Sequence, residues 1–178
     1  MNRNRKKEEM LTSGNFRKFV NYDATSGFFT WLERTWGAAP KRFNVRYAGT
    51  RAGASHVRGY RQIGLEGFGM FGEARLAWLY MTGKWPKDEI DHINGDPSDN
   101  RFANLREATS SENKANRRVQ DTSRSGIKGV RFKNGKWLAS VKKDGRSVHL
   151  GSFASAEAAS AAFACAVKLV RGEFARHE

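Results

Sequence analysis

The sequence contains a single cysteine, Cys165, among its 178 residues. One thiol excludes an internal disulfide and a zinc site built from cysteine pairs, and it suits a reducing compartment such as the cytoplasm. No apolar run approaches the ~20 residues that a membrane-spanning helix needs, and the N-terminus lacks the hydrophobic core of a signal peptide. Because Cys165 has no partner cysteine, we expect it to be a small buried or half-buried side chain.

Acidic residues are also scarce, with 18 Asp and Glu against 32 Lys and Arg, so the formal net charge is +14. This excess predicts a polyanionic partner such as nucleic acid, with an anionic membrane surface as the alternative. Residues 1–85 carry 15 basic and 6 acidic side chains, residues 86–118 carry 6 and 7, and residues 119–178 carry 11 and 5. A near-neutral centre between two basic flanks fits a catalytic segment with DNA contacts on both sides.

The near-neutral centre contains the densest group of metal-binding and proton-transfer side chains, DHINGDPSDNRFANLREATSSENKAN. Residues 90–93 and 105–108 are typical of short strands, and Asn94-Gly95 favours a turn because both residues tolerate positive φ. Thr109 and Glu112 form a capping-box pattern, which predicts a helix beginning there. The expected order is strand, loop, strand, helix.

This order could bring Asp91 and His92, at the end of one strand, opposite Asn113 in the first turn of the helix. Mg²⁺ prefers hard oxygen ligands and keeps several waters, so one carboxylate and one amide can form its whole protein shell. A neutral histidine beside the ion can deprotonate a water at neutral pH, and the ion stabilises charge on a phosphate. An Asp-His or Asn-Gly pair alone is more simply a turn or loop feature, but the combination indicates phosphodiester hydrolysis.

The segment Asp91–Asn116 closely resembles the HNH nuclease motif of phage-encoded and homing endonucleases. The resemblance implies that Asp91 is a metal ligand and His92 the general base. It implies that Asn104 holds the loop that orients His92, and that Asn113 is a metal ligand where other HNH proteins have histidine. The pieces YDATSGFFTW and RLAWLYMTGKWP also resemble the leader of phage HNH proteins. No CxxC pairs flank the motif, so no structural zinc is available.

The N-terminal flank is expected to be a small α+β region. Residues 1–7 are predicted to be a solvated basic tail, with phosphate contact as the alternative. The pattern then predicts a helix from Thr12 or Ser13 through Val20, a hairpin over residues 22–31, and a loop over residues 33–56 whose arginines could track a DNA backbone or simply solubilise the loop. Further on, it predicts a strand pair over residues 59–68 and an amphipathic helix from Glu73 to Thr82 that ends at Gly83.

The sequence pattern of the C-terminal flank predicts three short strands followed by one helix. The strands are expected at 128–133, 136–142 and 147–153, with hairpin turns at Asn134-Gly135 and Asp144-Gly145. Ser155 is the expected N-cap of an Ala-rich helix that runs to about Arg171. Basic side chains could share the sheet face opposite this helix; they are Lys128, Arg131, Lys133, Lys136, Lys142 and His149. Alternating lysines are also typical of a solvated sheet face.

The sequence GIKGVRFKNGKWLASVKKDGRSVHLGSFASAEAASAAFACAVKLVRG closely resembles the AP2 DNA-binding domain, over residues 125 to about 174. The resemblance implies a three-stranded sheet on one helix, with Lys128, Arg131, Lys136 and Lys142 at DNA-facing positions. Ser147 and His149 depart from the family, which commonly has a basic residue and Trp there. The polar segment before this region contains further candidates for phosphate contact, namely Arg117, Arg118 and Arg124.

These observations predict an α+β protein with a ββα-metal (HNH) nuclease core. The expected domains are a basic N-terminal region at 1–85, the HNH motif at 86–118, a linker at 119–126 and the AP2-like domain at 127–178. The predicted function is a Mg²⁺-dependent (or Mn²⁺-dependent) endonuclease that nicks double-stranded DNA as a monomer, with a dimer as the alternative. Two other hypotheses are a DNA-binding regulator with a decayed nuclease core and a protein that binds RNA or a membrane surface by charge alone.

Overall fold

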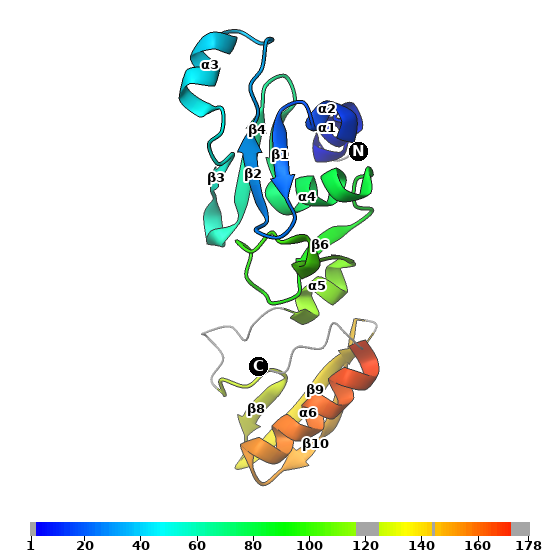
Figure 1. The fold of residues 1–178 in the computed structure, drawn as a ribbon. Helices are drawn as coiled ribbons and strands as arrows, with labels where there is room; N and C mark the ends of the chain where they lie inside the picture. Colours follow the sequence, from blue (N-terminus) through cyan, green and yellow to red (C-terminus); the bar gives the residue numbers. More distant parts are fainter. Residues whose placement is uncertain (1–2, 117–124, 144, 172–178) are drawn as a thin grey trace. The chain divides into compact units, whose positions relative to one another are not determined.

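A computed structural model of the protein describes residues 3–116, 125–143 and 145–171. The chain divides into two compact units, Met1–Ala108 and Thr109–Glu178. The division falls between the second strand and the helix of the predicted nuclease motif. Figure 1 labels the helices and strands of both units.

The N-terminal unit contains four α-helical segments, seven strands and two 3₁₀ turns. The helices are α1 (Arg3–Met10), α2 (Ser13–Phe16), α3 (Pro40–Tyr47) and α4 (Glu73–Thr82), and the 3₁₀ turns are η1 (Val57–Gly59) and η2 (Phe102–Asn104). The strands are β1 (Val20–Asp23), β2 (Phe28–Trp31), β3 (Ala54–Ser55), β4 (Arg61–Leu65), β5 (Gly69–Gly72), β6 (Glu89–His92) and β7 (Leu105–Ala108). They form an antiparallel hairpin β1-β2, a sheet in the order β3-β4-β5 and a second hairpin-like pair β6-β7.

One apolar cluster holds these small sheets together around α4. Fully buried side chains come from α2, the β1-β2 hairpin, β4 and α4; the largest are Phe16, Phe29, Ile63, Leu76 and Leu79. Helix α4 has the predicted bounds, and Gly83 ends it in the left-handed conformation at φ 77°. The predicted hairpin over residues 22–31 is also present, and Gly27 occupies its turn at φ 74°.

The predicted tail at the N-terminus is wrong, because Arg3–Met10 forms helix α1. Glu8 on this helix accepts hydrogen bonds from Nε and Nη2 of Arg75 at 2.8 and 2.9 Å. Arg75 lies on α4, so a contact 67 residues away in the sequence anchors a segment whose own composition gives no apolar face. The tertiary ion pair is therefore the physical reason for the difference.

The next helix, α2, begins where predicted but is shorter. Thr12 caps it by accepting a hydrogen bond from the backbone N–H of Asn15, and the helix ends at Phe16. Val20 was expected on this helix, but it begins β1 and pairs with Trp31. Pairing with the strand β2 thus ends the helical segment early.

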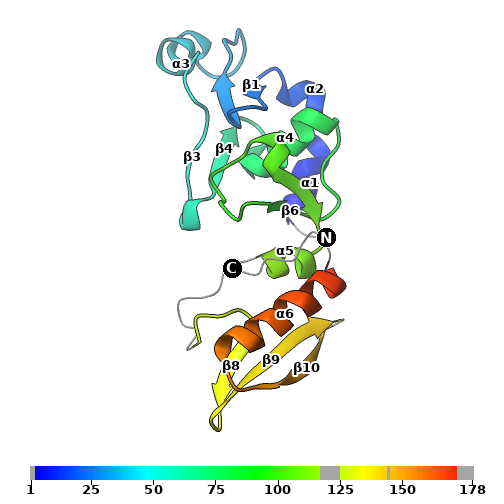
Figure 2. The same cartoon turned by 60° about the horizontal axis from the view of Figure 1, so that its bottom comes forward.

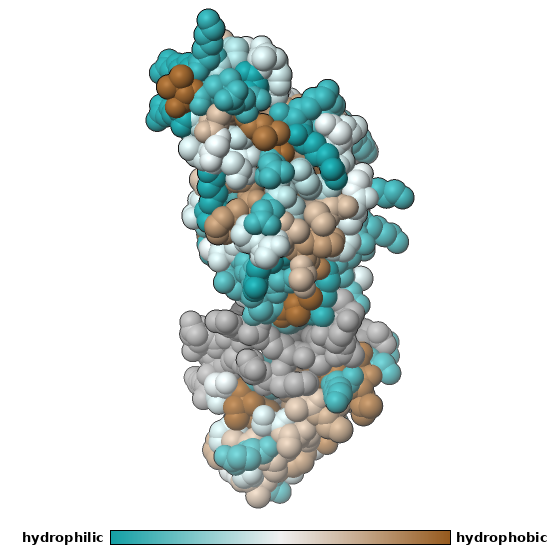
Figure 3. Space-filling view, in the orientation of Figure 1, coloured by the Kyte–Doolittle hydropathy of each residue, from teal (hydrophilic) through white to brown (hydrophobic). Residues whose placement is uncertain are grey.

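Helix α3 lies within the segment predicted to be a loop. Pro40 occupies its first turn, as the fixed φ of proline allows. Its inner side is held by Arg34, whose guanidinium lies 3.6 Å from the ring centre of Phe43 and whose backbone N–H and C=O both bond to the Asn44 amide at 3.0 Å. On the outer side Val45 is 91% exposed, and Figure 3 shows hydrophilic side chains around a hydrophobic patch at this end of the unit.

The strand pair predicted over residues 59–68 is displaced. Strand β4 ends at Leu65, a turn follows, and β5 begins at Gly69, with Ile63 opposite Phe71. The predicted pair ends at Phe68, because glycines are typical of the bends between strands. The second strand instead contains two of them, Gly69 and Gly72.

The C-terminal unit begins with helix α5 (Ser110–Asn116) and contains a three-stranded sheet and one long helix. The strands β8 (Val130–Lys133), β9 (Lys136–Lys143) and β10 (Arg146–Phe153) are antiparallel in the order β10-β9-β8. Helix α6 (Ala156–Arg171) covers one face of the sheet, as Figures 1 and 2 both show. The core between them consists of Val130, Ala139, Val141, Ala159, Phe163 and Val167. Among the described residues no helix combines the length and the apolar composition needed to cross a membrane.

Two details of this unit correct the predictions. Strand β8 begins at Val130 rather than at Lys128, because Gly129 has φ 70° and a side chain there would collide with the ring of Phe163. Cys165 is exposed on α6 rather than buried, since it faces away from the side on which Phe163 and Val167 are buried. The predicted N-cap is present, with the Ala158 N–H donating to Ser155 Oγ at 3.2 Å.

Candidate active site

Asp91 and His92 are the last two residues of β6 and are buried in the N-terminal unit. Their exposed fractions are 3% and 6%. Strand β6 pairs with β7 in antiparallel register, so that Asp91 lies opposite Arg106 and His92 opposite Leu105. A short two-stranded pair therefore presents a carboxylate and an imidazole at adjacent positions, where the chain leaves the strand.

The carboxylate of Asp91 is held by Arg106. Nε and Nη2 of the guanidinium both lie 2.9 Å from Asp91 Oδ2, and both side chains are largely buried. Two donors of one rigid guanidinium converge on the same oxygen, and this contact restrains the orientation of the carboxylate.

The loop that follows His92 is organised by Asn104. Its Oδ1 accepts from the Asn94 N–H at 2.9 Å, and its Nδ2 donates to Asn94 Oδ1 at 3.0 Å and to the Asp99 carbonyl at 2.8 Å. The Ile93 N–H also donates to the carbonyl of Asn104 at 2.9 Å. One amide thus joins the start and the end of the loop between β6 and η2. This is the loop that the HNH resemblance implies Asn104 would hold.

Asp99 is a carboxylate in the same loop that accepts several hydrogen bonds. Arg101 donates from Nε and Nη2 to its two oxygens at 2.8 and 2.6 Å, and Asn94 Nδ2 donates at 2.7 Å. The hydrogen bonds from Arg101 lower the pKa of the Asp99 carboxyl to about 2. The loop is therefore built around an ionised carboxylate.

His92 contacts a chain of buried polar groups on its other side. Its Nε2 lies 3.1 Å from Oδ1 of Asn100, whose Nδ2 donates to Glu73 Oε2 at 3.1 Å. Glu73, the first residue of α4, accepts from Arg61 Nε at 3.0 and 3.2 Å. Burial raises the pKa of the Glu73 carboxyl, and the charge of Arg61 opposes that shift. An exposed tyrosine, Tyr60, lies edge-on to the imidazole at 6.2 Å between ring centres.

The second predicted metal ligand, Asn113, lies on α5 in the C-terminal unit. The capping box predicted for this helix is present: Thr109 N–H donates to Glu112 Oε2 at 2.7 Å, and Glu112 N–H donates to Thr109 Oγ1 at 3.3 Å. Asn113 N–H donates to the Thr109 carbonyl at 3.0 Å, which places the residue in the first turn. The structure thus brings Asp91, His92 and Asn104 together in one unit and describes Asn113 in the other.

The donor set fits a hard divalent cation that keeps much of its water. No three His, Cys, Asp or Glu side chains gather to bind a metal in the parts of the chain that the structure describes. At the end of β6 the candidate ligands are the buried carboxylate of Asp91 and amide oxygens. Mg²⁺ is bound in this manner, through one or two protein oxygens with water and phosphate as its other ligands.

The predicted DNA-binding residues lie in the C-terminal unit or outside the described residues. Arg117, Arg118 and Arg124 fall outside the described residues. Five residues alternate with the buried positions of β8–β10 and so lie on the face opposite α6; they are Arg131, Lys133, Lys136, Lys142 and His149. All five are exposed.

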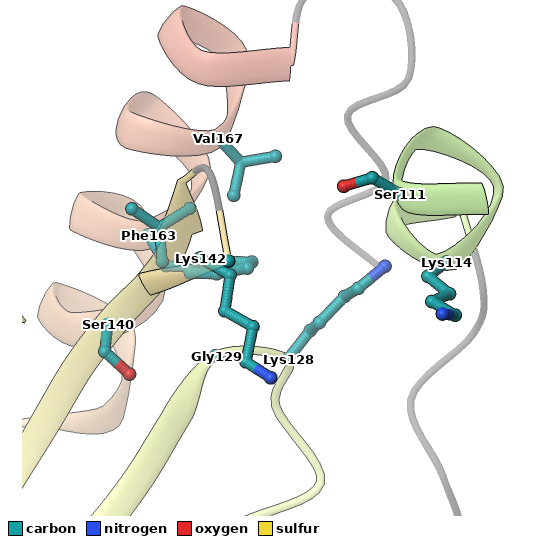
Figure 4. A pocket seen from close by; sticks show the side chains of 10 residues that line it. Ser111, Lys114, Lys128, Gly129, Ser140, Lys142, Phe163 and Val167 are labelled. Atoms are coloured by element: carbon teal, nitrogen blue, oxygen red, sulfur yellow. The ribbon is translucent and has the colours of Figure 1, made fainter. Parts of the chain in front are cut away.

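Lys128 precedes the sheet, in the turn before β8. It lines a hollow of about 310 Å³ together with Lys142, Lys114 and Ser111, with Phe163 and Val167 as apolar lining. Figure 4 shows the long side chain of Lys128 extending toward Ser111. Because it lies in the turn before β8, Lys128 is at the border of the sheet, and Lys142 on β9 lines the same hollow.

Sequence reasoning missed four residues that hold the two central side chains, namely Arg61, Glu73, Asn100 and Arg106. Asn100 follows Asp99 in a stretch that indicates a turn, and Glu73 looks like an ordinary acidic residue in the first turn of a helix. Nothing in a single sequence shows that these two are 2% and 1% exposed. The cross-strand position of Arg106 could have been found, because pairing residues 90–93 with residues 105–108 places it near Asp91.

Comparison with known families identifies the same segment. Residues 74–115 match the family model described as HNH endonuclease. The matched range includes Asp91, His92, Asn104 and Asn113, and it begins one residue after Glu73. No curated protein matches the chain. The match supports a DNA-cleaving hydrolase of the HNH type, with DNA as its substrate.

Proposed function

We propose that this protein is a metal-dependent endonuclease that nicks duplex DNA, of the phage-encoded, homing-type group. The observation that carries the proposal is the pair Asp91 and His92, buried side by side at the end of β6 within the segment that matches the HNH family. On the resemblance alone, the enzyme is assigned to the cytoplasm of a bacterial host.

The metal would be held by Asp91 and Asn113, and Mg²⁺ or Mn²⁺ suits this set of oxygen ligands. When bound, the ion supplies positive charge against the scissile phosphate and the leaving oxygen. Arg106 keeps the Asp91 carboxylate in a fixed orientation.

His92 would act as the general base. A neutral imidazole would take a proton from the attacking water as the water oxygen bonds to phosphorus. The bond from phosphorus to the leaving oxygen would break, and that oxygen would take a proton from solvent. Asn104 holds the loop that begins beside His92, through its bonds to Asn94 and Asp99. Burial of His92 restricts the motion of its ring. The attacking water would therefore meet the imidazole in a single orientation.

The C-terminal unit would bind the duplex. A three-stranded sheet packed on one helix supports this proposal, and exposed Arg131, Lys136 and Lys142 lie on the sheet face opposite α6. A sheet with such a face can enter the major groove or follow the phosphates. One active site per chain cleaves one strand, so a monomer is expected to nick and a dimer would be needed for a double-strand break.

Supercoiled plasmid tests the proposal directly. The full chain with Mg²⁺ is expected to convert supercoiled DNA to the relaxed circle, and His92→Ala is expected to abolish the conversion. His56→Ala is the matched control, because His56 is an exposed histidine of the same unit. DNA retardation without cleavage under Mg²⁺ or Mn²⁺ would favour the non-catalytic regulator, and competition by unrelated RNA or anionic vesicles would favour binding by charge alone.

A further inference from the structure

Asn100 is a buried amide that joins the candidate base to a buried ion pair. Its Oδ1 lies 3.1 Å from His92 Nε2, and its Nδ2 donates to Glu73 Oε2 at 3.1 Å. The exposed fractions of Asn100 and Glu73 are 2% and 1%. Both ends of one small side chain are thus engaged by titratable groups in a water-poor environment.

The chemistry of Glu73 decides which way the Asn100 amide points. Arg61 Nε lies 3.0 and 3.2 Å from the two Glu73 oxygens, and Arg61 Nη2 also donates to the carbonyl of Gly53 at 3.2 Å. A carboxylate that accepts from a guanidinium is ionised and has no proton to donate. The amide must therefore offer its N–H group to Glu73, which leaves its oxygen facing His92.

The backbone of Asn100 is held as firmly as its side chain. Tyr22 donates its phenolic hydrogen to the Asn100 carbonyl at 2.6 Å, and burial of this hydroxyl raises its pKa. Gly27 in the β1-β2 turn approaches the same peptide so closely that a Cβ there would lie 2.4 Å from Asn100 C and from Arg101 N. The hairpin and the phenol leave little freedom for the amide to move away from His92.

An acceptor oxygen beside Nε2 determines the tautomer of the imidazole. A neutral histidine carries one ring N–H, and the hydrogen bond to Asn100 Oδ1 requires that it be on Nε2. The lone pair is then on Nδ1. The order Arg61, Glu73, Asn100, His92 fixes each donor and acceptor in turn.

We propose that Glu73 and Asn100 are positioning residues that hold neutral His92 in its Nε2–H tautomer, so that Nδ1 is the atom that receives the proton from water. The inference rests on the proposed function for the identity of His92 as the base. The tautomer itself is a property of the folded chain and can be measured without DNA or metal.

Nitrogen-15 NMR of the full chain, recorded at about pH 8 where histidine is ordinarily neutral, measures the tautomer. We expect Nε2–H for His92 in the wild type, with a ring proton that exchanges slowly. In Glu73→Gln the new amide has to present its oxygen to Arg61 and its NH₂ to Asn100. Asn100 would then rotate and donate to His92 Nε2, so the expected tautomer of the variant is Nδ1–H.

The matched control is Glu66→Gln, which makes the same substitution in another Arg–Glu pair of this unit, where Arg34 Nη1 lies 2.8 Å from Glu66. It should leave the His92 tautomer unchanged. If Glu73→Gln does not fold, Asn100→Ala provides a second measurement: the slow exchange of the His92 ring proton should be lost. An Nδ1–H wild type, a folded Glu73→Gln without a tautomer change, or slow exchange that persists in Asn100→Ala would each overturn the proposal.

Nicking kinetics link the tautomer to catalysis. Glu73→Gln should lower kcat by about 100-fold with KM changed by less than about threefold, because the lone pair has moved away from the water while DNA contacts are intact. A tautomer switch with unchanged kcat would overturn the role of Nδ1. A wild-type chain that shows the Nε2–H tautomer but cleaves no DNA would instead refute the proposed function and leave the structural relation intact.

Discussion

Asp91 and Arg106 are direct cross-strand partners in the β6-β7 pair, with Nε and Nη2 of the arginine both 2.9 Å from Asp91 Oδ2. The two side chains are 4% and 13% exposed, so the pair is shielded from water. Cross-strand neighbours of opposite charge stabilise a short antiparallel pair, and a pair of only four residues per strand depends on such contacts. The carboxylate proposed to bind the cation is thus also part of the scaffold.

Arg106→Ala is expected to lower the free energy of unfolding by about 3 kcal/mol, because it leaves a buried carboxylate without its cationic partner. Urea unfolding followed by circular dichroism measures this change. The control is Arg101→Ala, since Arg101 is 55% exposed in its pair with Asp99 and its loss should cost less than about 1 kcal/mol. Equal effects of the two substitutions would contradict the structural role assigned to Arg106.

The sequence predicted the elements whose signals are local. Helix α4 was predicted with its observed bounds, because an apolar face and a terminal glycine mark both its nature and its end. Strand β7 was predicted from the alternation of apolar and polar residues within it. The turn at Asn134-Gly135 was predicted from two residues that tolerate positive φ, and both have it in the structure. The capping box at Thr109 and Glu112 likewise needed only four adjacent residues.

The elements that the sequence did not predict depend on contacts between distant residues. Helix α1 is fixed by the hydrogen bonds that Arg75 donates to Glu8, and helix α3 by the contacts of Phe43 and Asn44 with Arg34. The same distinction applies to the site. The motif predicted Asp91 and His92 as site residues, whereas Glu73, 27 residues from Asn100, joins the candidate site only through the fold.

Asn104→Ala should loosen the loop that follows His92. The substitution removes three hydrogen bonds, two to Asn94 and one to the Asp99 carbonyl, at a cost of about 1–3 kcal/mol. We expect faster hydrogen exchange at the Asn94 amide and slower nicking. Asn104→Asp keeps an acceptor for that amide while it loses the donors, so exchange should be intermediate. Unaltered protection of the Asn94 amide in Asn104→Ala would show that the loop does not depend on this residue.

The charge of the loop predicts a response to acid. Hydrogen bonds from Arg101 lower the pKa of Asp99 from its ordinary value of 3.8 to about 2. Because the folded state favours the ionised form, the stabilisation is fully present above the ordinary pKa and is lost as the pH falls through about 2. Carboxyl NMR titration should show this value, and Arg101→Ala should raise it. Glu157 in the C-terminal unit, whose pKa is lowered by hydrogen bonds from its own N–H and from Ser155, is the internal reference and should not respond.

The sheet face of the C-terminal unit predicts where the chain binds duplex DNA. Lys136 is exposed on β9, on the face opposite α6, whereas Lys168 is an exposed lysine on α6 itself. In a plot of log affinity against log salt concentration, loss of one phosphate contact reduces the steepness of the slope by about 1. In a His92→Ala background, which prevents cleavage, Lys136→Ala should weaken binding and reduce this slope by about 1, while Lys168→Ala should change neither. The comparison separates a DNA-binding face from a solvated one, because general charge attraction would make the two lysines equivalent. Equal slopes for both variants would therefore indicate that this sheet face is an ordinary solvated surface and not the DNA-binding face.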